Sequence, residues 1–334
     1  MHPDHASLAP EPHRPDLVRP LVLFLATVAC VFHAGAMHQL QYSGLGNLPG
    51  FVEGLLDPNF MRQGAAFAVP LLGILLTHEF GHFFAARYHG VPASLPHFIP
   101  LPMLGTGTFG AVIGMHGRIR SRDALLDIGA SGPLAGLLVA VPVLAYGLLH
   151  SRVEELGATG YMQEGQSLLY VAMKRVLLGP IPAGHDVFLH PTAYAGWVGI
   201  LVTMINLIPV GQLDGGHVAY ALFGERYNEA ARWVHRSLLL MWAGNVVFFI
   251  AYVLEKVLDG SIPWSFSTAA IIVFGNSSFW LLWFGLLAGM GKLSGSFDHP
   301  PVDPGELSFG RRAIAWICVA VFVLLFMPTP FAQY

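Results

Sequence analysis

The chain has 334 residues, of which 54% are hydrophobic and only 11% are charged. Soluble domains carry roughly 25% charged residues, so this composition excludes an ordinary soluble globular protein, and its high hydrophobicity excludes a disordered one. The 17 basic and 20 acidic residues leave no basic excess for binding nucleic acid. The composition therefore indicates a polytopic membrane protein.

Residues 1–16 are rich in Pro and His, and we expect them to form a disordered tail before a single domain over 17–334. A bilayer core needs about 20 apolar helical residues per span. We predict an all-α fold of about six to seven transmembrane helices, with a core over 64–217 and additional C-terminal helices over 238–330. The apolar stretches lie near 19–37, 64–86, 124–149, 193–210, 238–254, 269–290 and 312–329. The fourth stretch is short and contains Asn206 and Pro209, which predicts a broken helix.

The distribution of basic residues predicts an orientation. With seven spans and the N-terminus inside, the inner loops carry twelve Lys and Arg residues and the outer loops five. This bias follows the positive-inside rule. It places the end of the second span and the end of the fourth span on the same, inner side.

Two connections have unusual sequences. Residues 91–123 are apolar but dense in Gly and Pro, with a β-like run over 109–113, so we expect a re-entrant or interfacial hairpin on the inner face. Residues 150–192 form the longest connection, and we expect a short amphipathic helix near 168–178 within it. The Gly-x-Gly element at 105–107 has no strand–turn–helix setting, so no nucleotide site is expected.

The motif HEFGH at residues 78–82 lies inside the second apolar stretch. Residues four apart on a helix share one face, so His78 and His82 are placed to bind one metal ion, with Glu79 beside them as a proton acceptor. Zinc suits such a ligand set and leaves a position for water. Buried core histidines without a metal are the alternative, but ionisable residues inside an apolar span favour a functional site.

Two histidines fill half of a tetrahedral site, and Asp214 in the segment NLIPVGQLDGGH (206–217) is the candidate third ligand. It follows the broken fourth span, and Gly215 and Gly216 allow the backbone to turn sharply and approach closely. A plain helix-end residue at the membrane interface is the alternative for Asp214.

HEFGH in a span, followed by NLIPVGQLDGG, resembles the site-2 protease family of intramembrane zinc metalloproteases, peptidase family M50. GTFGAVIG (107–114) resembles the small membrane-associated β-hairpin of this family, and GASGPLAG (129–136), which opens the third span, also resembles a family feature. The late GKLSGSFDHPPV (291–302) resembles members from bacteria, archaea and plastids that lack a PDZ insertion. The resemblance covers about residues 64–330.

The resemblance implies one zinc ion per chain, held by His78, His82 and Asp214, with Glu79 as general base and acid. It implies that Asn206 positions the substrate or stabilises the oxyanion. The implied activity is hydrolysis of peptide bonds within or near transmembrane segments of membrane-protein substrates. The edge strand over 109–113 is expected to hold the unwound substrate by β-augmentation.

Two other functions remain open. A metal transporter would also use intramembrane His and acidic residues but gives no role to Glu79. A catalytically silent member would bind membrane partners without needing His78. The tail, which lacks a transit-peptide composition, favours a bacterial inner membrane. The charge bias of the loops places the active site towards the cytosol. The natural substrate, the regulation and the oligomeric state are not predicted.

Overall fold

The computed structural model describes residues 17–43, 49–102, 105–115, 117–156, 161–261, 265–293, 298–303 and 305–333. The predicted tail over 1–16 lies outside these residues. Five of the described helices are long and apolar enough to cross a membrane: α1 (Val18–Tyr42), α4 (Ala65–Tyr88), α5 (Arg122–Leu149), α9 (Arg226–Leu258) and α10 (Phe266–Leu293). The chain is therefore mostly helical, with the make-up of a polytopic membrane protein.

The two remaining predicted spans are also helical but shorter. The fourth corresponds to α7 (Pro191–Asn206) and the seventh to α11 (Phe309–Leu325), which have 16 and 17 residues. Both are shorter than the about 20 residues that cross a bilayer without help. The break predicted in the fourth span is present, because α7 ends at Asn206 and a separate helix, α8 (Asp214–Phe223), begins after a turn.

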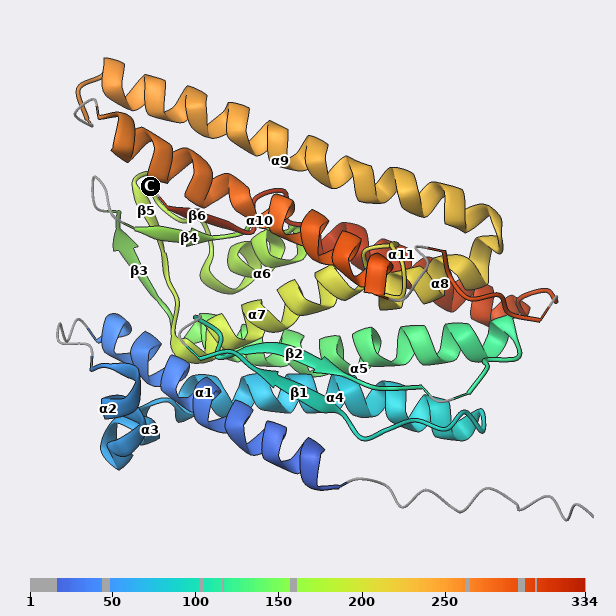
Figure 1. Cartoon of the computed structure of the whole chain (residues 1–334). Helices are drawn as coiled ribbons and strands as arrows, with labels where there is room; N and C mark the ends of the chain where they lie inside the picture. The colour runs from blue at the N-terminus through green and yellow to red at the C-terminus, as the bar shows by residue number, and fades with distance from the viewer. Residues whose placement is uncertain are drawn as a thin grey trace, which may run out of the picture.

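The helices stack in layers, with α1 against α4, α4 against α5, and α5 against α7 and α8 (Figure 1). Leu71, Ile74 and Leu75 of α4 fill the centre, where they pack with Leu144 of α5 and Ile200 of α7. The paired helices α9 and α10 lie along the other side of the body and contact each other more than they contact the rest. Their outer faces are apolar and exposed, as lipid-facing surfaces are.

Among the described residues, three two-stranded antiparallel sheets are present. The predicted hairpin consists of β1 (His97–Pro100) and β2 (Thr108–Val112), with His97 opposite Val112 and Pro100 opposite Thr108. The long connection holds the predicted helix, α6 (Leu168–Leu178). It also holds strands that the sequence did not indicate: β3 (Arg152–Glu155), which pairs with β5 (His185–Phe188), and β4 (Met162–Glu164). The short helices α2 (Phe51–Leu56) and α3 (Pro58–Gln63) follow α1.

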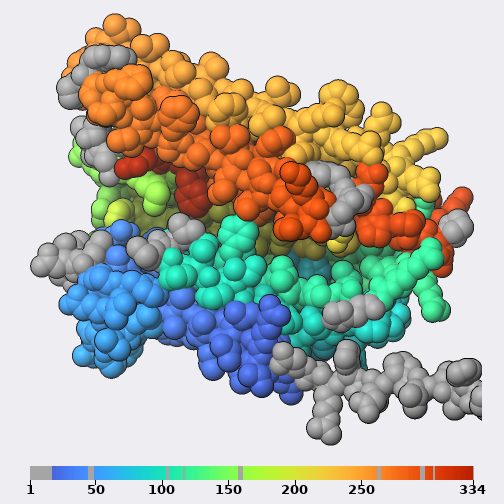
Figure 2. Space-filling model, viewed as in Figure 1, coloured from blue at the N-terminus to red at the C-terminus, as the bar shows by residue number. Residues whose placement is uncertain are grey.

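The C-terminal residues attach the α9–α10 pair to the body. Strand β6 (Phe331–Gln333) pairs with β4. The side-chain amide of Asn276 on α10 donates to the Gln333 carbonyl through Nδ2 and accepts from the Gln333 N–H through Oδ1. The Trp280 indole donates to the Pro328 carbonyl at 2.7 Å. Figure 2 shows this red C-terminal strip between the orange pair and the green connection.

Candidate metal centre

Three side chains from two distant helices converge inside the bundle. His78 and His82 lie one turn apart on α4, and their Nε2 atoms are 3.2 Å apart. Asp214, the first residue of α8, places Oδ2 3.3 Å from His78 Nε2 and Oδ1 3.2 Å from His82 Nε2. The structure thus brings together the three residues that the sequence predicts as metal ligands.

A tight turn between α7 and α8 carries Asp214 to the histidines. Gly215 is packed so closely that a Cβ there would stand 2.0 Å from the Leu207 carbonyl oxygen, and one at Gly216 would stand 2.3 Å from that of Gly211. Because any larger side chain would push the turn open, these two glycines provide the close approach that the sequence predicts.

Helix α5 orients the histidines although it supplies no ligand. His82 Nδ1 donates to the Ile128 carbonyl at 2.7 Å, which leaves the lone pair on Nε2 directed to the shared point. Gly132 and Gly136 lie directly against the rings of His82 and His78. Sequence reasoning missed these roles; the glycine spacing in GASGPLAG was the signal that could have revealed them.

The three side chains open into a cavity of about 170 Å³. Glu79 lines it and is buried, at 6% exposure. Asn206, at the end of α7, also lines it, with Nδ2 3.2 Å from His78 Nε2. Glu79 and Asn206 therefore share one cavity with the three candidate ligands.

Strand β2 forms part of the wall of this cavity through Ala111, Val112 and the following Ile113. On one side β2 pairs with β1, and within the described part of the chain no strand pairs with its other edge. An open edge offers backbone N–H and C=O groups to another extended chain. Phe109 stacks on Trp283 of α10 with ring centroids 5.6 Å apart, which holds the hairpin next to that helix.

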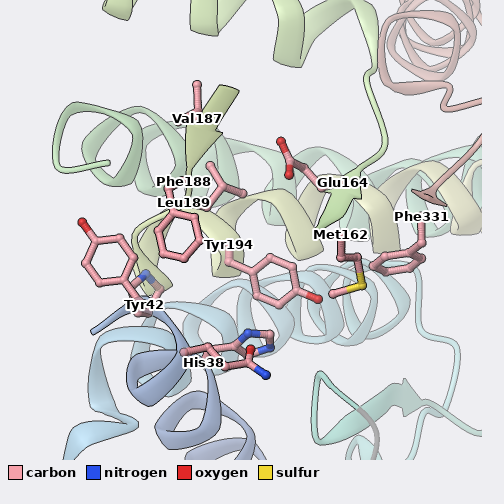
Figure 3. A pocket seen from close by; sticks show the side chains of 11 residues that line it. His38, Tyr42, Met162, Glu164, Val187, Phe188, Leu189, Tyr194 and Phe331 are labelled. Carbon is pink, nitrogen blue, oxygen red and sulfur yellow. The ribbon is translucent and has the colours of Figure 1, made fainter. Parts of the chain in front are cut away.

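A second cavity, of about 140 Å³, lies at the other end of α7 (Figure 3). Its walls carry His38, Tyr194 and Glu164 among apolar side chains. Glu164 already accepts a hydrogen bond from the Tyr170 hydroxyl and lies 3.8 Å from Lys174 Nζ. Since one imidazole and one engaged carboxylate do not make a metal ligand set, the cavity beside Glu79 is the candidate site.

The geometry of the three candidate ligands fits zinc. Ligand atoms about 2.0–2.1 Å from a tetrahedral zinc ion lie roughly 3.4 Å from one another, close to the 3.2–3.3 Å separations here. Asp214 Oδ2 is buried and has no hydrogen-bond donor among the described residues. A buried carboxylate oxygen without a donor is costly, and a bound cation removes that cost.

Fold and site together define a helical, membrane-type protein with a buried His–His–Asp centre of the kind that binds a metal ion. The family model described as peptidase family M50 matches residues 66–250. The chain belongs to peptidase family M50.

The chain is 34% identical over 223 residues to "Probable zinc metalloprotease EGY1, chloroplastic" of Arabidopsis thaliana. The aligned region covers 61% of this chain and 39% of that protein. It is 30% identical over 188 residues to "Probable zinc metalloprotease EGY2, chloroplastic" of Oryza sativa subsp. indica, covering 54% of this chain and 34% of that protein. The chain thus spans less than half the length of these relatives. Their names place them in chloroplasts and lend no support to the expected bacterial membrane. No solved structure matches the chain significantly.

Proposed function

We propose that the chain is an intramembrane zinc metalloendopeptidase that hydrolyses peptide bonds within or near transmembrane segments of membrane proteins. The observation that carries this proposal is the convergence of His78, His82 and Asp214 on one point beside Glu79, inside apolar helices. Family membership and the names of the relatives support it.

In this proposal, His78, His82 and Asp214 hold one zinc ion per chain. Zinc, when bound, supplies a Lewis acid that polarises a carbonyl and lowers the pKa of water. The Ile128 carbonyl keeps His82 in the tautomer that presents Nε2.

Glu79 acts as the general base and acid. It lies one residue from His78, in the same cavity, and no hydrogen bond to another described side chain engages its carboxylate. Glu79 takes a proton from the attacking water and returns it to the leaving amine, a role in which a positioned carboxylate contributes about 10²–10⁴ in rate.

Asn206 supplies a hydrogen bond to the substrate. Its Nδ2 lies 3.2 Å from His78 Nε2, but that nitrogen cannot accept a hydrogen bond when it binds a metal ion. The Asn206 amide is then free to donate into the cavity, where a developing oxyanion on the substrate would accept it.

The substrate is a transmembrane helix that has been locally unwound. A peptide bond inside a helix has its backbone groups hydrogen-bonded, so the chain must become extended before cleavage. The open edge of β2 beside the cavity suits an extended peptide, which would add as a further strand.

The chain is proposed to act as a single domain over 17–334, in a lipid bilayer, with the metal centre nearer the cytosolic side. Arg311 at the start of α11 bonds Asp127 near the start of α5, and His89 after α4 bonds the same carboxylate. The start of α5, the start of α11 and the end of α4 therefore lie on one side of the chain. Together with other loops rich in Lys and Arg, they form the side predicted to be cytosolic. A bacterial inner membrane stays a prediction.

The test begins with zinc per chain in detergent-purified protein. Wild type and Glu79→Gln should each contain about one zinc, whereas His78→Ala and Asp214→Ala should contain none. His185→Ala, which alters a histidine on the distant strand β5, is the matched control and should keep zinc. A zinc content that is unchanged in Asp214→Ala would contradict the proposed metal centre.

The second stage measures cleavage of a panel of single-span proteins in vesicles. Glu79→Gln should lose cleavage by about 10²–10⁴-fold. Zinc uptake into vesicles without cleavage would instead support a transporter. Cleavage at the wild-type rate by Glu79→Gln would reject the proposed mechanism.

A further inference from the structure

Two buried histidines, distant in the sequence, form a hydrogen-bonded pair at the wall of the metal-site cavity. His217 Nδ1 lies 2.7 Å from His299 Nε2, and the residues are 8% and 5% exposed. His217 belongs to α8 and lines the cavity with Glu79 and Asp214. His299 belongs to the segment between α10 and α11, outside the residues that the family model matches.

His299 is held in place by three further contacts. Its Nδ1 lies 2.7 Å from the Pro300 carbonyl oxygen, and its backbone N–H donates to Asn228 Oδ1 at 3.0 Å. Its ring stacks on Tyr220 of α8 with centroids 4.3 Å apart. These three contacts hold the His299 ring in a single orientation.

The direction of each hydrogen bond follows from the Pro300 carbonyl, which can only accept. His299 Nδ1 therefore carries a proton. Burial lowers the pKa of His299, so its ring is neutral and its Nε2 is an acceptor. The Nδ1 of His217 must then be the donor in the pair, and a neutral His217 keeps its lone pair on Nε2.

Close packing of α8 against α5 fixes the position of His217 relative to the candidate metal ligands. A Cβ at Gly129 would stand 2.6 Å from His217 Cβ, so α5 and α8 are in close contact at this point. Across the described part of the chain, no hydrogen bond engages His217 Nε2. The ring thus has one nitrogen committed to His299 and one available in the cavity.

We propose that the segment 298–303 completes the active site: His299 and Pro300 fix the tautomer of His217, and His217 Nε2 accepts a hydrogen bond from an N–H or O–H donor in the metal-site cavity. That donor is a peptide N–H of the substrate or a water molecule. His299 is a positioning residue that acts through His217. The inference rests on the proposed peptidase function and extends it to a segment beyond residues 66–250, which the family model matches.

The first measurement is the tautomer itself, read by long-range ¹H–¹⁵N correlation in protein labelled with ¹⁵N-histidine. His217 should show a protonated Nδ1 and an unprotonated Nε2, and its signals are identified by their loss in His217→Asn. His299→Phe keeps an aromatic ring on Tyr220 but removes the acceptor, so the His217 signals should shift. His235→Phe is the matched control, since His235 is also a buried histidine stacked on an aromatic ring, that of Phe284.

The second measurement is steady-state cleavage. His299→Phe should lower kcat/KM by about 10- to 100-fold, the usual effect of losing a partner that orients a site residue. His299→Gln keeps an acceptor for His217 and should restore most of the activity, and His235→Phe should match the wild type. A higher KM would identify the donor as a substrate N–H, whereas a lower kcat at constant KM would identify water.

The outcomes separate this inference from the proposed function. A His217 with protonated Nε2 in the wild type, or wild-type tautomer and kinetics in His299→Phe, would overturn the inference. Absence of zinc, or full activity of Glu79→Gln, would overturn the proposed function instead. The tautomer measurement requires no substrate, so it tests the histidine pair in either case.

Discussion

Gly132 of α5 lies against the imidazole of His82, so closely that a Cβ at this position would stand 2.0 Å from His82 Nε2. One turn further along, a Cβ at Gly136 would lie 3.1 Å from that of His78. Helix α5 is therefore the surface against which both candidate histidine ligands are held, and its glycines set how closely the imidazole rings approach the α5 backbone.

Gly132→Ala should abolish or weaken zinc binding without altering a ligand. The added methyl group overlaps the His82 ring, which must rotate away from His78 and Asp214, and loss of such support lowers metal affinity about 10- to 100-fold. Zinc per chain after dialysis against a weak chelator measures the effect. Gly73→Ala on α4, where no heavy atom lies within 4 Å of the added Cβ, is the control. Wild-type zinc affinity in Gly132→Ala would show that the ring does not need this space.

Much of the fold could be predicted because apolar length alone marks helices in a membrane-type chain. The second and third stretches match α4 and α5 to within about two residues. The spacing of HEFGH placed His78 and His82 on one face, and the broken span with its two glycines placed Asp214 near them. These are local signals, and they were sufficient for the candidate ligands.

The parts that were not predicted depend on contacts between distant segments. Strand β6 pairs with β4 across more than half of the chain, and three-residue strands carry little pattern of their own. The same holds for the contact of Gly132 with His82 and for the pairing of His217 with His299. Periodicity shows which face of a helix is apolar, but not which residue of another helix it contacts.

Glu164 should make stability depend on pH. Burial raises the pKa of this carboxyl above its ordinary value of 4.5, so the folded chain binds the proton more tightly than the unfolded chain does. This contribution to stability is complete below about pH 4.5 and is lost as pH rises through the folded-state pKa. Thermal unfolding of wild type and Glu164→Gln between about pH 4 and 8 isolates the effect. The variant should show the flatter profile, and parallel profiles would exclude Glu164 as the source.

Arg311 should stabilise the end of the bundle where α4, α5 and α11 meet. Its guanidinium bonds both oxygens of Asp127, at 2.6–2.9 Å, and Asp123 Oδ2 at 3.1 Å. The side chain is 31% exposed, so Arg311→Ala should cost roughly 1–2 kcal/mol after allowance for solvent screening. Thermal unfolding compares it with the neighbouring Arg312→Ala, for which no ion pair is present among the described residues. Arg311→Lys should be intermediate, because Lys cannot form the paired bonds. Equal melting of both alanine variants would contradict this role.

Substrates whose transmembrane helix unwinds easily should be cleaved faster. A Gly in place of Ala destabilises a helix by about 1 kcal/mol, which corresponds to roughly a fivefold gain in the unwound population. Single-turnover cleavage in vesicles should therefore rise about fivefold when one Gly is introduced beside the cleaved bond. The same substitution two turns away is the control and should have a smaller effect. Equal rates for all three substrates would mean that unwinding does not precede the slow step.

Asp214 and the two histidines lie about 130 residues apart along the chain, yet they meet at one point. A metal ion bound there acts as a cross-link that closes a very long loop, and long loops lose the most entropy on closure. Metal occupancy and the position of α8 against the α4–α5 pair are thus thermodynamically linked, so a chelator that strips the ion should loosen α8 before it affects the α9–α10 pair.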